Sequence, residues 1–304
     1  MELRDADLVV RTRGLTKNFG KRTVVDGLDL AIPRGGVYGF LGPNGSGKST
    51  TMKMLLGLLH PSAGQVFLLG EDPWGEARAR LMPRIGSMIE HPPGYGHLTG
   101  AENMRLLARL LNLETTRIDR ALELVRLTDH RDRLQRTYSL GMKQRLGIAM
   151  ALAREPELLI LDEPTNGLDP AGIEEIRELM IHLASGGVTV MISSHLLDEI
   201  DRMADILGVL SQGRLVFQGS RKELFERSIP DLLVVTPQAN AAANLVRGCR
   251  LERNGIRVQG CGQEDAARLI VRLVQEGIPI HEVRRLQQSL EEVFMDLTGG
   301  AEAL

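Results

Sequence analysis

Three short, mainly apolar stretches lie in the first two thirds of the chain, at residues 36–41, 158–161 and 188–192. Runs of this kind are typical of strands that are buried on both faces of a parallel sheet. Each run is followed by polar residues or by a glycine-rich segment. Ligands of open α/β sheets bind at the carboxyl ends of the strands, so the pattern predicts an α/β fold with a site where these runs end.

Further strands are expected around these runs. Residues 8–13 alternate weakly between apolar and polar side chains and are predicted to form the first strand. The next residues, 14–20, are predicted to turn. Strands are also predicted at residues 28–32, 64–70 and 85–90. A glycine or proline stands at the end of each of these stretches or within two residues after it, and ends the predicted strand.

The pattern becomes helical between residues 98 and 153. Thr99 followed by Glu102 has the spacing of a capping box, and residues 118–125 keep the 3.6-residue period. Residues 140–153 are predicted to form an amphipathic helix. The block is therefore interpreted as a helical subdomain, at about residues 90–155, inserted between two parts of the sheet.

The pattern changes again after a predicted pair of strands at residues 208–219. Pro230 marks a domain boundary, and beyond it short strands and helices alternate. We expect an α/β domain at residues 1–225 and a small α+β domain at residues 231–304. The second domain shows no cluster of catalytic residue types and is interpreted as a packing or interaction module.

Composition narrows the class of protein. The 304 residues carry 37 Lys and Arg against 39 Asp and Glu, and this net charge of −2 gives no electrostatic argument for a nucleic-acid partner. Cys249 and Cys261 lack metal-ligand spacing and are predicted to be reduced thiols. The sequence shows no signal peptide and no apolar run of the roughly 18 residues that a membrane span needs. If the protein works at a membrane, we expect another chain to supply the spans.

The glycine-rich segment after the first apolar run has the pattern G-x-x-x-x-G-K-[ST] between a predicted strand and a predicted helix. Glycine lets backbone N–H groups turn toward an anion, and the following helix adds the positive end of its dipole. Lys48 is predicted to reach the β- and γ-phosphates of a nucleoside triphosphate, and Ser49 to hold Mg²⁺. The candidate phosphate-binding residues are Gly42, Pro43, Asn44, Gly45, Ser46, Gly47, Lys48, Ser49 and Thr50.

Four further residues are candidates for the same site. Asp162 and Glu163 end the all-apolar run, where one carboxylate can hold Mg²⁺ and the other can polarise the attacking water. His195 ends the next apolar strand, and its place there favours a functional role over a structural one. Phe19 has two interpretations: stacking on a nucleobase, or a partly buried aromatic at a strand end.

Taken in order, residues 8–222 resemble the ATP-binding subunits of ABC transporters. The segment Gly42–Thr50 is similar to the Walker A loop of that family, and Leu158–Glu163 is similar to the Walker B strand. The segment Tyr138–Arg145 resembles the ABC signature, whose usual form is L-S-G-G-Q followed by K/R-Q-R. The resemblance implies a P-loop NTPase fold of ABC type: a mixed-sheet core with a helical subdomain, here followed by the small C-terminal α+β domain.

The resemblance also implies roles for single residues. The segment Gly167–Asp169 matches the D-loop, so Asp169 is expected at the nucleotide site. His195 corresponds to the switch histidine and Phe19 to the adenine-stacking aromatic. Ser139 and Gly141 are expected to contact the γ-phosphate of ATP bound to the opposite subunit.

Two departures from the family pattern narrow the subfamily. The signature has Leu140 and Met142 where glycine and glutamine are usual, and Glu90 stands where most relatives have the glutamine of the Q-loop. These features resemble the bacitracin-resistance and lantibiotic-immunity exporters, in which an acidic E-loop replaces the Q-loop. Glutamate adds a full negative charge near Mg²⁺, so Glu90 joins Ser49 and Asp162 as a candidate metal-site residue and joins the catalytic candidates.

The resemblance implies an ATPase, with ATP and Mg²⁺ as cofactors, that drives export of an antibiotic or peptide-type substrate through a separate permease. We expect a second copy or a homologous ATP-binding subunit as partner, no nucleic acid, and a cytoplasmic location at the inner face of the cell membrane. The transported substrate is expected to be selected by the permease. Two alternatives stay open: an exporter of lipid, polysaccharide or ions, which Glu90 argues against, and a soluble ABC ATPase acting on ribosomes or DNA. The second has little support because the chain has one phosphate loop and only a modest helical insertion.

Overall fold

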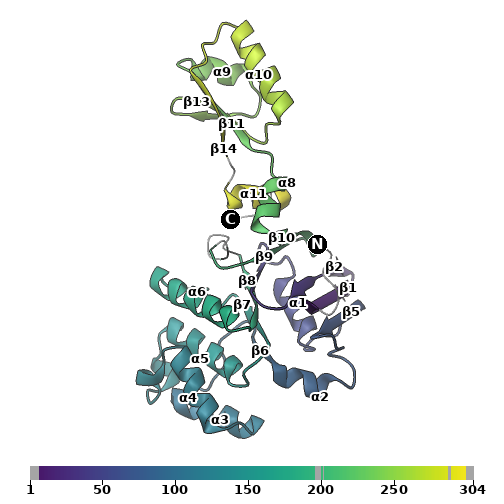
Figure 1. Ribbon diagram of the computed structural model, residues 1–304, viewed down its shortest axis with the longest axis vertical. Helices are drawn as coiled ribbons and strands as arrows, with labels where there is room; N and C mark the ends of the chain where they lie inside the picture. The colour runs from purple at the N-terminus through teal and green to yellow at the C-terminus, as the bar shows by residue number, and fades with distance from the viewer. Residues whose placement is uncertain (1–6, 196–199, 201, 287–288, 299–304) are drawn as a thin grey trace. The chain divides into compact units, whose positions relative to one another are not determined.

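The computed structural model describes residues 7–195, 200, 202–286 and 289–298 (Figure 1). Residue contacts divide the chain into two compact units, with the division between Ser220 and Arg221. The helix that begins at Arg221 therefore belongs to the second unit, although it precedes the boundary expected at Pro230. Residues 299–304 of the expected second domain lie outside the described residues.

The first unit contains a six-stranded central sheet in the order β10-β9-β4-β8-β7-β6. The four strands β4, β6, β7 and β8 run parallel to their neighbours, β9 runs parallel to β4, and β10 closes the edge antiparallel to β9. Every residue of β4, β7 and β8 is buried, as the apolar runs predict. The strands are β4 (Val37–Leu41), β6 (Ile85–Met88), β7 (Leu158–Asp162), β8 (Thr189–Ser194), β9 (Ile206–Ser211) and β10 (Arg214–Ser220).

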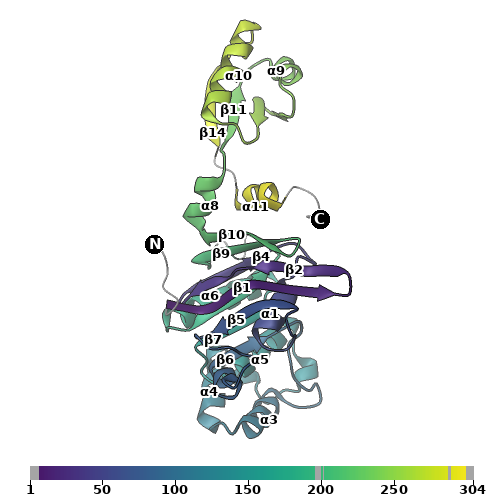
Figure 2. The same ribbon diagram turned by 90° about the vertical axis from the view of Figure 1, so that its right-hand side faces the viewer.

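A second, antiparallel sheet covers one side of the phosphate-loop helix. Its strands are β1 (Leu8–Phe19), β2 (Arg22–Leu28), β3 (Ala31–Pro33) and β5 (Ala63–Leu68). Helix α1 (Lys48–Leu55) lies between this sheet and the central sheet, because its buried Met52, Met54 and Leu55 share one hydrophobic core with residues of both (Figure 2). Packing from two sides holds α1 in place against the strand that precedes the loop.

The turn predicted at residues 14–20 is wrong, because β1 continues through it to Phe19. Gly14 has a left-handed backbone, with φ 57°, and the pairing of β1 with β2 shifts register between Leu15 and Lys17. The irregularity is absorbed as a bulge while Leu15 stays fully buried. A glycine that breaks an apolar pattern thus marks a bulge here instead of a chain reversal.

The helices of the first unit include the predicted helical subdomain. Its first helix begins with the predicted capping box: Glu102 N donates to Thr99 Oγ1 at 3.1 Å, and Thr99 N donates to Glu102 Oε2 at 2.7 Å. Figure 1 shows α6 on the opposite side of the central sheet from α1. The helices and 3₁₀ turns other than α1 are α2 (Arg78–Leu81), η2 (Met82–Arg84), α3 (Gly100–Leu111), α4 (Thr115–Leu124), η3 (Thr128–His130), η4 (Gln135–Thr137), α5 (Leu140–Leu152) and α6 (Pro170–Ser185).

The second unit is a four-stranded antiparallel sheet in the order β12-β13-β11-β14, accompanied by helices. It has its own core, which includes Leu232, Val234, Ile256 and Leu273. The alternation of strands and helices predicted for the α+β domain is present, with the short β12 in addition. The elements are α8 (Arg221–Arg227), β11 (Asp231–Val235), α9 (Ala239–Leu245), β12 (Arg250–Glu252), β13 (Gly255–Val258), α10 (Gln263–Gln275), β14 (Glu282–Leu286) and α11 (Leu290–Thr298). Within the part of the chain that is described, no helix combines the length and apolarity needed to cross a bilayer.

An ion-pair cluster ties together the starts of the central strands. Glu157, just before β7, accepts hydrogen bonds from Arg84 Nε at 2.6 Å and from Arg34 at 2.8 Å. These two bonds lower the pKa of Glu157 to about 2. The cluster lies at the amino ends of the strands, so it serves stability at the edge opposite the carboxyl ends.

Glu157→Gln is expected to lower the free energy of unfolding by about 1 kcal/mol at pH 7, a figure discounted for solvent screening because the side chain is 40% exposed. Because the pKa is lowered on folding, the stabilisation is complete above the unfolded pKa of 4.5 and is lost as the pH falls toward 2. Urea titrations at several pH values should therefore show the two proteins converging in acid. A difference that is independent of pH would contradict the assignment, and Glu123→Gln on the exposed side of α4 is the control.

Candidate nucleotide site

The glycine-rich loop joins β4 to α1, and close backbone approaches explain its glycines. Gly47 has φ 107°, and a Cβ there would lie 2.8 Å from Val24 O. A Cβ on Gly42 would lie 2.5 Å from both Leu210 O and Ser46 Oγ. Ser46 Oγ itself is buried and has no hydrogen-bond partner in the described part of the chain. The loop therefore has the compact backbone and the spare buried donor that suit an anion.

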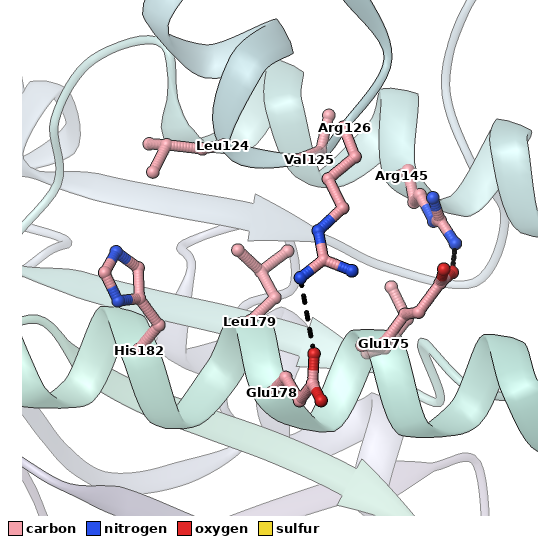
Figure 3. Close-up of a pocket in the computed structure, with 9 residues that line it drawn as sticks. Leu124, Val125, Arg126, Arg145, Glu175, Glu178, Leu179 and His182 are labelled. Atoms are coloured by element: carbon pink, nitrogen blue, oxygen red, sulfur yellow. Dashed lines mark hydrogen bonds and ion pairs between the residues drawn. The ribbon is translucent and has the colours of Figure 1, made fainter.

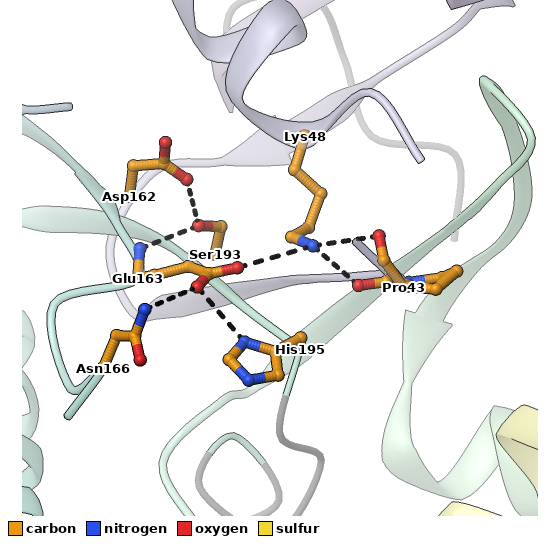
Figure 4. Close-up of polar contacts among 8 residues, drawn as sticks. Pro43, Lys48, Asp162, Glu163, Asn166, Ser193 and His195 are labelled. Atoms are coloured by element: carbon orange, nitrogen blue, oxygen red, sulfur yellow. Dashed lines mark hydrogen bonds and ion pairs between the residues drawn. The ribbon is translucent and has the colours of Figure 1, made fainter. Parts of the chain in front are cut away.

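Lys48 begins α1, is only 5% exposed, and directs its ammonium group into the loop (Figure 4). Its Nζ donates to Gly42 O at 2.6 Å and to Pro43 O at 3.2 Å, and lies 3.7 Å from Glu163 Oε1. Burial lowers the pKa of Lys48, and the negative charges of Glu163 and Asp162 act in the opposite direction. A positive charge is thus held between the loop after β4 and the acidic residues at the end of β7.

Asp162 and Glu163 follow one another at the end of β7, but they occupy different environments. Asp162 is buried, and its Oδ1 accepts a hydrogen bond from Ser193 Oγ at 2.6 Å. The same Ser193 Oγ accepts a hydrogen bond from Glu163 N at 2.9 Å. Ser193 lies directly beside Asp162 in the parallel pairing of β7 with β8. One serine therefore orients both acidic residues.

Ser193 was not among the predicted site residues. The available signal was the polar run of Ser193, Ser194 and His195 at the end of an apolar strand. That run could not indicate a contact with Asp162 until the register of β7 against β8 was known.

Glu163 points its carboxylate toward both Lys48 and His195 (Figure 4). Its Oε2 lies 3.1 Å from His195 Nδ1 and accepts a bond from Asn166 Nδ2 at 3.4 Å. The backbone of Glu163 is left-handed, with φ 45°, which is uncommon outside glycine and occurs preferentially at functional sites. The conformation turns the carboxylate out of the buried strand, so that 22% of the side chain is exposed.

A divalent cation fits the oxygen atoms gathered here. Mg²⁺ prefers hard oxygen ligands and is commonly held by one or two protein side chains together with phosphate oxygens and water. The Ser49 hydroxyl follows Lys48 on the first turn of α1, and the Asp162 carboxylate ends β7 of the central sheet. Among the described residues, no group of three or more His, Cys, Asp or Glu side chains could hold a metal ion by itself.

The structure places Glu90 at an exposed position just after β6, with φ 67°. Its Oε1 lies 2.5 Å from Lys53 Nζ of α1. The hydrogen bond from Lys53, followed by its positive charge, lowers the pKa of Glu90. The carboxylate predicted for the metal site is therefore bound by a lysine of the phosphate-loop helix.

The signature and the D-loop form a second group of candidates. Ser139 caps α5 by accepting a bond from Met142 N at 3.2 Å, and Asp169 caps α6 by accepting one from Gly172 N at 3.0 Å. Leu140, 45% exposed, lies over Gly167, where an added Cβ would approach Leu140 Cδ2 to 2.8 Å. Within the described residues, no hydrogen bond or ion pair joins Ser139 or Gly141 to the phosphate loop. One chain thus brings together the Walker A, Walker B and histidine candidates and leaves the signature apart from them.

Phe19 ends β1 and is 50% exposed, with Lys17 Nζ 5.2 Å from its ring centroid.

A separate cavity of about 210 Å³ lies between α4, α5 and α6 (Figure 3). Arg126 pairs there with Glu178 at 3.4 Å, and Arg145 pairs with Glu175. None of the predicted site residues lines this cavity, so the nucleotide site is assigned from the side-chain geometry at the phosphate loop.

A phosphate loop between strand and helix, with an acidic pair at the end of another parallel strand of the same sheet, defines a P-loop nucleotide-binding ATPase. Residues 25–166 match the family model described as ABC transporter. The chain is 39% identical to the bacitracin transport ATP-binding protein BcrA of Enterococcus faecalis over 97% of each chain. It is 42% identical to the lantibiotic transport ATP-binding protein SrtF of Streptococcus pyogenes, over 73% of this chain and 97% of that one. The structure of cbiO1 from Clostridium perfringens, part of the ABC transporter complex cbiONQ, superposes with a TM-score of 0.67 at 30% identity, covering 73% of this chain and 92% of that one.

The chain belongs to the ABC transporter family, as one of its ATP-binding subunits. The resemblance and the fold predicted from the sequence are both confirmed. The protein is therefore an ATP-binding ATPase of the kind that works with a membrane permease component.

Proposed function

We propose that this subunit powers the export of an antibiotic or peptide-type substrate through a separate permease, with ATP bound between two ATP-binding subunits. The observation that carries the proposal is the near full-length likeness to a bacitracin transport ATP-binding protein. The likeness to a lantibiotic transport protein and the glutamate at position 90 support the same class of substrate. Selection of the individual substrate is assigned to the permease.

Phosphate binding is assigned to residues 42–50. The N–H groups at the start of α1 and the Lys48 ammonium would surround the phosphates with positive charge. Lys48 suits this role because it is buried at the loop and is already held by the loop's own carbonyl oxygens. Phe19, exposed at the end of β1, would stack on the adenine.

Mg²⁺ binding is assigned to Ser49 and Asp162, with Glu90 near it. The ion would supply charge neutralisation at the phosphates. Ser193 would keep Asp162 in the correct orientation through the hydrogen bond to Oδ1.

Hydrolysis is assigned to Glu163 and His195. The Glu163 carboxylate is partly exposed, lies next to the Lys48 ammonium, and would polarise the attacking water. His195 would hold the γ-phosphate and respond to its loss, because its ring already contacts Glu163 at 3.1 Å. The two side chains come from neighbouring strands, so the parallel sheet aligns them.

Dimer formation is inferred from the residues that one chain leaves apart. Ser139, Gly141 and Asp169 lie at the amino ends of two helices, and neither Ser139 nor Asp169 is buried. A second subunit in head-to-tail orientation would present them to the phosphates held by Lys48. Loss of the γ-phosphate would then remove contacts from both sides and let the pair separate.

The proposal is tested by searching the neighbouring reading frames for a permease, expressing that permease together with the chain and purifying the complex in detergent. We expect co-purification, ATP-dependent pairing of the ATP-binding subunits by light scattering, and higher resistance of cells to a peptide antibiotic. A complex that forms and hydrolyses ATP but confers resistance to no antibiotic would overturn the substrate class. Failure to pair on ATP and to hydrolyse it would overturn the whole scheme.

A further inference from the structure

The ion pair between Lys53 and Glu90 is unexplained by the roles assigned so far. Lys53 lies on α1, five residues after Lys48, and Glu90 lies in the loop after β6. Their charged atoms are 2.5 Å apart, although the side chains are 32% and 58% exposed. Exposed ion pairs contribute little to stability, so folding alone is a weak reason for this contact.

The position of Lys53 on α1 places the ion pair near a candidate Mg²⁺ ligand. Ser49 and Lys53 are four residues apart, so they lie on the same face of α1 about one turn from each other. Ser49 is the candidate Mg²⁺ ligand on that face. Lys53 therefore holds the Glu90 carboxylate on the face of the helix that carries the Ser49 hydroxyl.

The backbone at Glu90 is strained, so a side-chain anchor would help to fix this turn. A φ of 67° is unfavourable for glutamate, and the chain turns there, with His91 N donating to Ile89 O at 2.9 Å. Pro92 and Pro93 follow, so the loop has few N–H groups of its own to fix it. The bond to Lys53 is the side-chain contact that connects this turn to α1.

The negative charge of Glu90 is a further reason for the contact with Lys53. Glutamine at position 90 would need no counter-charge, whereas glutamate brings a negative charge to the face of α1 that carries Ser49. Lys53 neutralises that charge without itself being aimed into the phosphate loop, where Lys48 is the cation. The Lys53 ammonium thus supplies the counter-charge for a glutamate at this position.

We propose that Lys53 is a positioning residue of the ATP site, which holds Glu90 beside Ser49 and neutralises it. The inference rests on the proposed function of the site and adds a residue to it. Lys53 acts through Glu90, so removal of its charge should matter only while position 90 is a glutamate. Loss of Lys53 should lower turnover more than nucleotide affinity, because Lys53 is placed to act on the loop and not on the phosphates.

The test is a double-mutant cycle of Lys53→Met and Glu90→Gln in the purified complex with the permease. We expect Lys53→Met to lower kcat about three- to tenfold, with KM for ATP changed less than twofold. In the Glu90→Gln background the same change should alter kcat less than twofold. Lys53→Arg, which keeps the charge, should retain at least half of kcat. Equal effects of Lys53→Met in both backgrounds, or no effect in either, would overturn the proposal.

A second readout does not depend on activity. Hydrogen exchange of peptides covering residues 85–98 should become at least threefold faster in Lys53→Met, and Lys53→Met should add nothing further to Glu90→Gln. Lys222→Met is the matched control, because it removes an exposed lysine that pairs with Glu226 on α8. Exchange in that loop should be unchanged by the control. Unchanged exchange in Lys53→Met would show that Lys53 does not hold the loop.

The thermal midpoint would show whether Lys53→Met is unstable. If it is, the proposal is tested with the variant in which both charges are reversed. Lys53→Glu combined with Glu90→Lys should exceed the kcat of either single reversal at least threefold, and a double variant no better than the singles would overturn the proposal. The two levels of inference fail differently. A wild-type complex that does not hydrolyse ATP contradicts the proposed function, whereas an active wild type with no coupling between positions 53 and 90 contradicts only the role of Lys53.

Discussion

Glu163→Gln is expected to reduce ATP hydrolysis at least a hundredfold while leaving ATP affinity within about threefold of the wild type. A positioned general base contributes roughly 10²- to 10⁴-fold to rate, and an amide cannot accept the proton. Affinity should survive because glutamine has nearly the same shape and because the phosphates are assigned to the loop and Lys48. The backbone hydrogen bond from residue 163 to Ser193 does not depend on the side chain and should keep the turn in place.

The measurement is steady-state phosphate release together with binding of a fluorescent ATP analogue. In the proposed scheme hydrolysis ends the paired state, so the variant should also accumulate as an ATP-bound dimer on size exclusion. Glu123→Gln makes the same chemical change on an exposed face of α4 and should leave all three readouts unchanged. Retention of most of the ATPase activity by Glu163→Gln would remove Glu163 from its assigned role.

Lys48→Ala is expected to weaken ATP binding about 10- to 100-fold and to abolish hydrolysis at ordinary ATP concentrations. A hydrogen bond to a charged group is worth about 1.5–3 kcal/mol, which corresponds to roughly that range of affinity. Lys48 differs from Glu163 in this respect, because it should act on the bound ground state as well as on the reaction. The pair of variants therefore separates binding from chemistry at one site.

Stability needs a separate check for Lys48→Ala. Lys48 lies 3.7 Å from Glu163 and its charge opposes those of Glu163 and Asp162, so its removal takes a compensating positive charge away from two acidic residues. The thermal midpoint without nucleotide should therefore be recorded beside the affinity. Lys222→Ala on α8 removes an exposed lysine and serves as the control. A folded Lys48→Ala protein with wild-type affinity would show that the loop binds phosphate without this lysine.

The sequence was sufficient for the parts of the site that lie within a single segment. The phosphate loop and the buried strand ending in Asp162 were predicted because strand, turn and helix signals stand next to each other in the chain. The capping box at Thr99 is equally local, and its two hydrogen bonds are present. Local chemistry decides these features, so a single sequence reveals them.

The sequence did not predict contacts between segments that are distant along the chain. Ser193 donates a hydrogen bond to Asp162 and accepts one from Glu163 N, and both depend on the register of two parallel strands, in which Ser193 and Asp162 are 31 residues apart. The pairing of Lys53 with Glu90 spans 37 residues and depends on where α1 packs. The extension of β1 to Phe19 was missed because neighbouring strands absorbed a glycine as a bulge. In each case tertiary packing, which leaves no pattern in one segment, determines the outcome.

The packing of Leu140 on Gly167 limits how this chain can be re-engineered. Replacing Leu140 by the glycine that is usual there would delete the side chain that covers Gly167. No larger residue at 167 could refill the space cheaply, because the backbone there has φ 74° and disfavours side chains. Introducing the consensus signature into this protein by single substitutions would therefore leave Gly167 uncovered. The signature and the D-loop would have to be redesigned together.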